Sequence, residues 1–173
     1  MHYHCEVYLK NLSEDVEDQI EKAMSPYYEG LEVELIKEDD DEYYINPVGF
    51  WDWYQIGGRW TGTHDNYDPE KDPDNIEVCR LCNGTGTRSD MKVPNGCNGC
   101  IGTGKSIKWP TQWKRYDGDI VNVSEIREDL SCYTLIIPEV GIFHQEEWSE
   151  NVPDKLKELN IVNGYLVTVD YHC

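Results

Sequence analysis

The sequence predicts an α+β protein in which a long insertion separates the strands of one sheet. Segments with the period of a strand lie near both ends of the chain, at residues 2–9 and 164–171. Each is accompanied by a segment with helical signals, at residues 13–26 and 152–159. Between them, residues 79–104 hold two cysteine- and glycine-rich repeats. A chain of 173 residues has room for one domain of ordinary size and a small attached module.

The N-terminal segment alternates between polar and apolar side chains, which point to opposite faces of a strand. One face carries His2, His4, Glu6 and Tyr8. The other face carries Tyr3, Cys5, Val7 and Leu9. The next segment predicts a helix with Ser13 as its N-cap and an end at Pro26. The apolar stripe of this helix consists of Val16, Ile20, Ala23 and Met24.

The last third of the chain predicts a hairpin, a helix and a final strand. Residues 133–137 and 141–145 are the expected strands of the hairpin, on either side of Pro138-Glu139. Without the insertion, the elements follow the order strand, helix, strand, strand, helix, strand. This order is the split βαβ pattern of a ferredoxin-like sandwich, which is the topology we expect.

The insertion contains the most specific pattern in the sequence, C-x-x-C-x-G-x-G, which occurs twice. The first copy starts at Cys79 and the second at Cys97. Two thiolates at this spacing can bind one metal ion, and two such pairs complete a tetrahedral zinc site. Glycine beside the cysteines lets the backbone adopt left-handed dihedrals and direct N–H groups toward sulfur. Neither chance CxxC pairs nor a disulfide framework would require these glycines. We predict one structural zinc ion, bound by Cys79, Cys82, Cys97 and Cys100.

The same repeats resemble the cysteine-rich module of DnaJ-type cochaperones. That module is built from four such repeats on an extended β-hairpin and binds two zinc ions, so two repeats imply one. The sequence lacks the His-Pro-Asp tripeptide of the J-domain, so the resemblance concerns the fold of the insertion and not its activity. The expected organisation is an arm of residues 79–104 and a discontinuous body of residues 1–78 and 105–173.

The charges of the chain are unevenly distributed. The net charge is −19, yet residues 79–115 contain seven Lys or Arg side chains and one Asp, so the remainder carries −25. A zinc ion with four thiolates contributes about −2, which leaves the arm basic. The basic and aromatic side chains expected to contact a partner are Arg80, Arg88, Lys105, Lys108, Trp109 and Trp113. The alternative is that the charge serves solubility and the clustering has no function.

Residues 50–62 form the densest aromatic segment of the chain. They contain Trp51, Trp53 and Trp60 around the triplet Gly57-Gly58-Arg59. We expect a turn in which aromatic side chains surround the guanidinium, an arrangement worth about 0.5–2 kcal/mol. The segment forms either a small core that covers one face of the sheet or a ligand pocket.

This aromatic segment also carries a second resemblance. The block Trp51-Asp-Trp-Tyr-Gln-Ile-Gly-Gly-Arg-Trp60 and the ending Val169-Asp170-Tyr-His172 resemble small uncharacterised proteins of bacteriophages and bacteria. The resemblance implies an origin in a phage or another mobile element. It implies no mechanism.

One group of polar side chains predicts a possible second site. If the first and last strands pair as antiparallel neighbours, His2 and His4 lie beside Asp170 and His172 on the same face of the sheet. His144 on the neighbouring hairpin could join them. Imidazoles with a carboxylate are common metal ligands and general acid–base groups. The alternative is a surface His-x-His in which Asp170 orients His172 by one hydrogen bond.

Three functions remain in order of preference. The first is a non-catalytic, acidic zinc protein that binds a host or phage protein, for example an inhibitor of the anti-CRISPR kind whose acidic body imitates nucleic acid. The second is a metal- or His-dependent hydrolase or nuclease that uses the His/Asp face, although no nucleophile motif or phosphate loop occurs. The third is nucleic-acid binding by the basic arm.

The sequence also predicts the cellular setting. The N-terminal residues lack the basic and apolar regions of a signal peptide, and no apolar run has the length of a membrane span. We therefore expect a cytoplasmic protein, in the host cytoplasm if a phage encodes it. In that reducing compartment Cys5, Cys132 and Cys173 are expected to remain free thiols.

Overall fold

The computed structural model describes residues 1–39, 41–88, 96–145 and 151–173. The chain forms two compact units. Unit 1 comprises Met1–Asn66 and Arg115–Cys173, and unit 2 comprises Tyr67–Lys114. Helices and strands are both present and the main sheet is mixed, which confirms the predicted α+β class.

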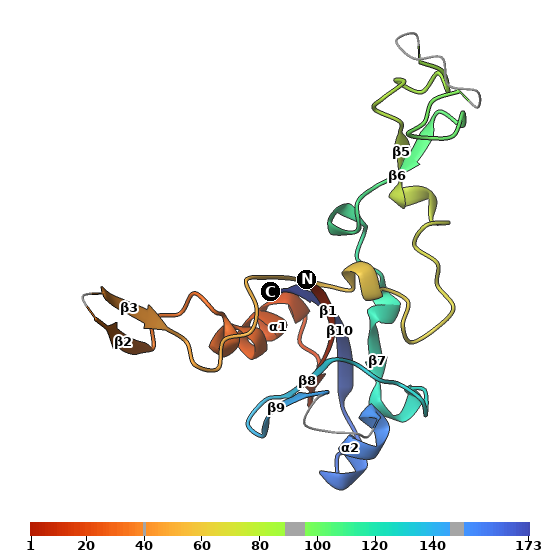
Figure 1. Ribbon diagram of the computed structural model, residues 1–173. Coiled ribbons are helices and arrows are strands. Elements are labelled where there is room, and N and C mark those ends of the chain that lie inside the picture. Colours follow the sequence, from red (N-terminus) through yellow and green to blue (C-terminus); the bar gives the residue numbers. More distant parts are fainter. Residues whose placement is uncertain (40, 89–95, 146–150) are drawn as a thin grey trace. The chain divides into compact units, whose positions relative to one another are not determined.

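Unit 1 is built around a six-stranded sheet with the order β4-β10-β1-β8-β9, in which β7 also pairs with β10. Its strands are β1 (His2–Leu9), β4 (Trp53–Ile56), β7 (Ile120–Asn122), β8 (Thr134–Ile137), β9 (Gly141–His144) and β10 (Tyr165–His172). The two longest, β1 and β10, are antiparallel along their whole length and lie side by side in Figure 1. Strand β8 runs parallel to β1 on its other side, and β9 forms the antiparallel edge.

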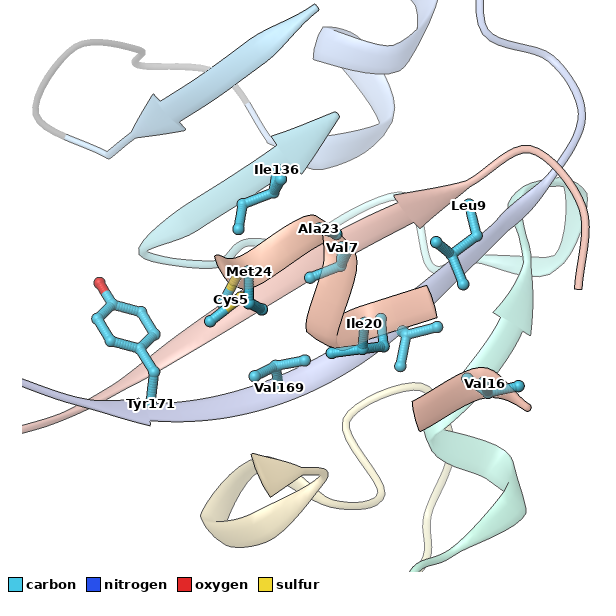
Figure 2. Close-up of a cluster of buried hydrophobic side chains, with 11 residues drawn as sticks. Cys5, Val7, Leu9, Val16, Ile20, Ala23, Met24, Ile136, Val169 and Tyr171 are labelled. Atoms are coloured by element: carbon cyan, nitrogen blue, oxygen red, sulfur yellow. The ribbon is translucent and has the colours of Figure 1, made fainter. Parts of the chain in front are cut away.

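One face of the sheet is covered by α1 (Val16–Met24), as Figure 2 shows. The predicted apolar stripe of α1 is buried against the apolar face of β1 and β10. The buried side chains of this cluster are Cys5, Val7, Leu9, Val16, Ile20, Ala23, Met24, Ile136, Val167, Val169 and Tyr171. The N-cap of α1 is Asp15 rather than Ser13, because the Asp15 side chain accepts a hydrogen bond from the backbone N–H of Asp18. The helix ends in a 3-10 turn, Ser25–Tyr27, which contains Pro26.

The other face is covered at one end by α2 (Val152–Glu158), whose N-cap is Asn151. Helix α2 packs on side chains that alternate with those facing α1, such as Leu166 beside Val167. The buried members of this second cluster are Leu130, Cys132, Leu135, Ile137, Val152, Leu156 and Leu166. Since the two helices lie on opposite faces, unit 1 has three layers, helix on sheet on helix.

The expected ferredoxin-like topology is wrong. In the split βαβ pattern both helices cover the same face, and another strand separates the two strands of each βαβ unit. Here β8 follows α1 and pairs directly with β1 in parallel. All four residues of β8 are buried, whereas those of β9 are half-exposed. A strand that buries both faces needs an interior position in the sheet, so β8 lies beside β1 and β9 forms the edge.

A separate hairpin extends unit 1, formed by β2 (Glu34–Glu38) and β3 (Asp41–Ile45). Three further 3-10 turns occur among the described residues of this unit. Two of them matter for the site, η2 (Gly58–Trp60) and η5 (Asp117–Asp119).

Unit 2 contains the two cysteine repeats on a short antiparallel ladder of β5 (Ile76–Val78) and β6 (Lys105–Ile107). This unit includes more residues than the predicted arm of residues 79–104. Asn75, which is fully buried, accounts for the extension: its carbonyl accepts the N–H of Lys108, and its side-chain oxygen accepts the N–H of Lys114. Residues 67–78 and 105–114, which the sequence assigned to the body, are thereby part of unit 2.

Candidate functional site

The four cysteines of the two repeats converge in unit 2. Their sulfur atoms lie within 4.8 Å of one another, and all four residues are buried. The Sγ atoms of Cys79 and Cys97 are 3.8 Å apart, and those of Cys82 and Cys100 are 3.7 Å apart. A tetrahedron with Zn–S bonds of about 2.3 Å has edges of about 3.8 Å. The arrangement can therefore hold a metal ion.

The glycines of the repeats have specific positions around the sulfurs. The N–H of Gly86 points to Cys82 Sγ at 3.3 Å, and the N–H of Gly104 points to Cys100 Sγ at 3.2 Å. Both glycines have positive φ, and a Cβ at Gly86 would lie 2.3 Å from the carbonyl oxygen of Gly102. The second half of the motif thus provides hydrogen bonds to the ligands, and only glycine fits.

The residue before the last glycine is threonine in both repeats, a position that the motif C-x-x-C-x-G-x-G leaves open. Thr85 Oγ1 donates to the carbonyl of Cys82, and Thr103 Oγ1 donates to that of Cys100, both at 2.7 Å. These bonds close the two turns in the same way. Although burial acts to raise it, the N–H of Gly86 lowers the pKa of Cys82 to about 7. A thiolate at neutral pH is the form that binds a metal.

The predicted contact residues of the arm are partly engaged within unit 2. Arg80 pairs with Glu77 at 3.0 Å, and Lys108 Nζ donates to the carbonyl of Asp74 at 2.5 Å. Trp113 is half-buried and donates from Nε1 to the carbonyl of Lys108. Trp109 is 72% exposed. Arg88 donates to the side chain of Asn98, and Lys105 is exposed.

Two aliphatic side chains of the repeats are exposed. Leu81 lies between the first two cysteines and Ile101 follows the last; they are 56% and 77% exposed. Ile101 has φ of +49°, a left-handed conformation that β-branched residues avoid. The equivalent position of the first repeat is Asn83, also at +49°, where asparagine is well tolerated. Ile101 thus keeps a strained backbone and exposes its side chain to solvent.

The predicted polar face exists in unit 1, on the side of the sheet that α2 covers only at one end. His2 lies opposite His172 in the register of β1 and β10, and His4 lies opposite Asp170. His2 Nδ1 is 2.9 Å from Asp170 Oδ1. His172 pairs instead with Asp52, at 2.8 Å. Within the described ranges, the four cysteines are the single group with metal-ligand spacing, so these four side chains do not form one metal site.

His144 does not join this face. Its Nδ1 is 3.1 Å from Thr134 Oγ1, which also bonds the hydroxyl of Tyr171. Tyr171 belongs to the cluster beneath α1. His144 therefore lies toward the opposite side of the sheet, because its register partner in the hairpin is Thr134.

The most buried charge of the face, Glu6, was not predicted as a site residue. Glu6 is fully buried, and its Oε1 lies 2.8 Å from His4 Nε2. Its Oε2 lies 3.4 Å from Nε2 of His64, whose side chain is 2% exposed. Thr168 links the same groups, since its hydroxyl lies 2.9 Å from Glu6 Oε1 and 3.0 Å from His64 Nε2. The alternation of residues 2–9 was the available signal for Glu6, whereas His64 had none.

Glu6 and His64 shift each other's pKa. Although burial acts to raise it, the neighbouring imidazoles of His4 and His64 lower the pKa of Glu6 to about 2. Burial acts to lower the pKa of His64, but the neighbouring Glu6 raises it overall. Glu6 is therefore ionised at neutral pH and compensated by histidine. The buried side-chain atoms of the described residues without a hydrogen-bond partner are Glu6 Oε2 and His64 Nδ1.

The Gly57-Gly58 turn holds the loop above the polar face. A Cβ at Gly58 would lie 2.5 Å from Asp170, and one at Gly57 would lie 2.2 Å from Asp119 Oδ2. The next residue, Arg59, donates its backbone N–H to Asp170 Oδ2 at 3.0 Å. Asp119 is fully buried and accepts hydrogen bonds from the hydroxyl of Thr61 and the N–H of Gly62. Two buried carboxylates thus anchor this loop, so its glycines are required for close approach.

The aromatic segment is divided between the core and the polar face. Trp51 packs beside the α1 cluster and donates from Nε1 to the carbonyl of Met24 at 2.9 Å. Trp60 is 37% exposed and stacks on the ring of His4, with 5.0 Å between the centroids. Arg59 is exposed, and its guanidinium makes no ring contact or ion pair with the described residues, contrary to expectation. The segment is part core and part rim of the polar face.

All seven cysteines lie in the described part of the chain, and none forms a disulfide. Cys5 and Cys132 are buried, and burial raises the pKa of both thiols. Across the residues with assigned positions, no helix combines the length and apolar character needed to cross a bilayer. Comparison of the chain with protein-family models, with curated proteins and with solved structures finds no match.

Proposed function

We propose that unit 2 of this protein is a non-catalytic zinc-binding module that binds a partner protein. The observation that carries the proposal is the closed set of four buried cysteine sulfurs at the spacing of a zinc tetrahedron. A site with four protein ligands leaves no open position for substrate, so the metal has a structural role. Unit 2 lacks a buried apolar cluster apart from these cysteines among its described residues, so metal binding would supply much of its folding free energy.

The exposed aliphatic side chains support a contact function for unit 2. Leu81 and Ile101 are held on turns that the metal would make rigid, and rigid apolar side chains lose little entropy on binding. Strain without compensating burial, as at Ile101, is a feature of functional positions. Lys105 is exposed nearby in the sequence, and Arg88 is half-exposed. This combination fits a partner with an apolar patch bordered by acidic residues.

A protein partner is favoured over nucleic acid for an electrostatic reason. Unit 1 contains eight Lys or Arg side chains and 28 Asp or Glu side chains. Unit 2 contains seven Lys or Arg side chains and six Asp or Glu side chains. A chain in which one unit carries −20 repels phosphate backbones at moderate salt. Exposed leucine and isoleucine also suit apolar contacts with a protein, whereas single-stranded nucleic acid is bound by stacking on aromatic rings. In this proposal the partner is a component of a host defence or nucleic-acid machine in the cytoplasm.

Capture of the partner tests this proposal. The zinc-loaded protein is immobilised and exposed to host lysate, and bound proteins are identified by mass spectrometry. Leu81→Asp is expected to reduce recovery of a specific partner at least tenfold, because a charge in an apolar contact is strongly unfavourable. Val140→Asp, at an equally exposed valine of unit 1, is the matched control and should leave recovery unchanged. Equal recovery with both variants, or a partner lost only with Val140→Asp, would contradict the proposal.

Ile101→Asn separates stability from binding at the same site. Asparagine is the residue that the first repeat has at this position, so the change should relieve strain and stabilise metal-bound unit 2 by about 1 kcal/mol. Partner binding should weaken at the same time. Thermal unfolding of the zinc-loaded protein and the capture assay measure the two effects, with Val162→Asn as the exposed control. Unchanged binding would show that Ile101 is not part of the contact surface.

A further inference from the structure

A cavity of about 290 Å³ opens beside the polar face of unit 1. Its walls include both N-terminal histidines of β1 and the ring of Trp60. The side chains that matter for its chemistry are His2, His4, Trp60, Ser131, Tyr133 and Gln145. The volume is at the lower end of the range for small-molecule sites. All the described residues that line this cavity belong to unit 1.

Each of the two histidines is held by a buried carboxylate behind it. His4 Nε2 is bound to Glu6 Oε1 at 2.8 Å, and His2 Nδ1 is bound to Asp170 Oδ1 at 2.9 Å. Both carboxylates are fully buried. Because Glu6 is ionised, its Oε1 accepts from His4 Nε2, and the neutral tautomer that donates from Nε2 has its lone pair on Nδ1. His4 Nδ1 makes no hydrogen bond with the described residues, and 7% of the side-chain surface of His4 is exposed.

The supports of these carboxylates make the geometry rigid. Glu6 also contacts Thr168 and His64, and Asp170 accepts the N–H of Arg59. Trp60 stacks on the ring of His4 with an interplanar angle of 14°. An imidazole that is fixed by a carboxylate on one nitrogen and open on the other is the arrangement of a general acid or base. Two of them border one cavity.

The charge around the cavity limits its ligand. No Lys, Arg, Asp or Glu side chain is among the described residues that line it, and the surrounding unit is strongly acidic. A phosphate or carboxylate ligand would find no Lys or Arg side chain among these residues and would be repelled by the acidic unit. Trp60 and Tyr133 offer aromatic surface, and Ser131 and Gln145 offer neutral hydrogen-bonding groups. The cavity suits an uncharged molecule with a planar group.

We propose that this cavity is a catalytic site in which His2 and His4 hydrolyse an uncharged ester. A water molecule forms the new bond to the carbonyl carbon and gives its proton to His4 Nδ1. The bond from that carbon to the alcohol oxygen breaks, and this oxygen takes a proton from Nε2 of protonated His2. The products are a carboxylic acid and an alcohol, and both imidazoles return to their starting states by proton exchange with solvent. Glu6 and Asp170 are positioning residues that hold the two rings.

Hydrolysis of p-nitrophenyl acetate by the full chain tests the proposal. Saturable hydrolysis is expected, with kcat/KM lowered about 100-fold by His4→Gln and by His2→Gln, the usual contribution of one acid–base group. Glutamine retains an N–H for the buried carboxylate, and the thermal midpoint of each variant reports whether it is folded. His144→Gln, on the other side of the sheet, is the matched histidine control and should leave the rate unchanged.

Two further measurements make the result decisive. In the wild-type protein, diethyl pyrocarbonate should modify His2 and His4 and abolish hydrolysis, and p-nitrophenol should protect both; this arm needs no variant to fold. Bis-p-nitrophenyl phosphate, an anionic ester, should not be hydrolysed. Hydrolysis that survives modification of both histidines, that falls equally with His144→Gln, or that favours the anionic ester would overturn the proposal. Absence of saturable hydrolysis would overturn it too.

Discussion

Metal removal is expected to unfold unit 2 and leave unit 1 folded. Zinc binding to a four-cysteine site supplies about 10–16 kcal/mol at neutral pH, which is more than the stability of a typical domain. Unit 2 has few other buried side chains among its described residues, whereas unit 1 has two apolar clusters. Cys97→Ser should have the same effect as a chelator, because three thiolates retain the ion weakly. Elemental analysis and resonances of backbone amides in each unit measure the outcome.

Cys132→Ser is the matched control, since Cys132 is equally buried but belongs to unit 1. The control should keep close to one zinc ion per chain and an ordered unit 2. Unit 1 should show unchanged amide resonances after chelation of the wild-type protein. A unit 2 that stays ordered without metal, or a Cys97→Ser protein with full zinc content, would refute the assignment of the ligands.

Glu6→Gln is expected to lower the free energy of unfolding of unit 1 by about 3–5 kcal/mol. Breaking a buried ion pair on one side leaves the other charge without compensation, which costs an amount of this size. Here the group left behind is His64, whose side chain is 2% exposed. Urea unfolding followed by tryptophan fluorescence measures the change. Glu128→Gln, at an exposed position, should change stability by less than about 0.5 kcal/mol.

The pH dependence of stability provides the second part of this test. The pKa of Glu6 is lowered from 4.5 to about 2, so its contribution is complete above pH 4.5 and is lost as the pH falls through 2. The pKa of His64 is raised above 6.5, so its contribution is complete below pH 6.5 and is lost as the pH rises through the higher value. The pair therefore stabilises unit 1 most between about pH 4.5 and 6.5. Glu6→Gln should remove this maximum, and a wild-type profile without it would contradict the ion pair.

The convergence of the four cysteines could be predicted because its information is local. Each repeat encodes its own turn in eight consecutive residues, and both copies use the same bonds, such as Gly86 to Cys82 and Gly104 to Cys100. The strand β1 and its apolar face could be predicted for a similar reason, since period-2 alternation specifies which side chains share a face. The pairing of His4 with Asp170 across β1 and β10 followed once the first and last strands were taken as neighbours.

The sequence by itself determined the α+β class, the four cysteines that cluster in unit 2 and the strand side chains of the polar face. Only the tertiary structure decided that β8 lies beside β1, that α1 and α2 cover opposite faces, and that Glu6 meets His64. It also divided the aromatic segment, since Trp51 packs against the core and Trp60 lines the cavity. Patterns in neighbouring residues show which face a side chain takes. The partner that it meets there comes from a distant segment, and that choice depends on how all the buried surfaces are covered at once.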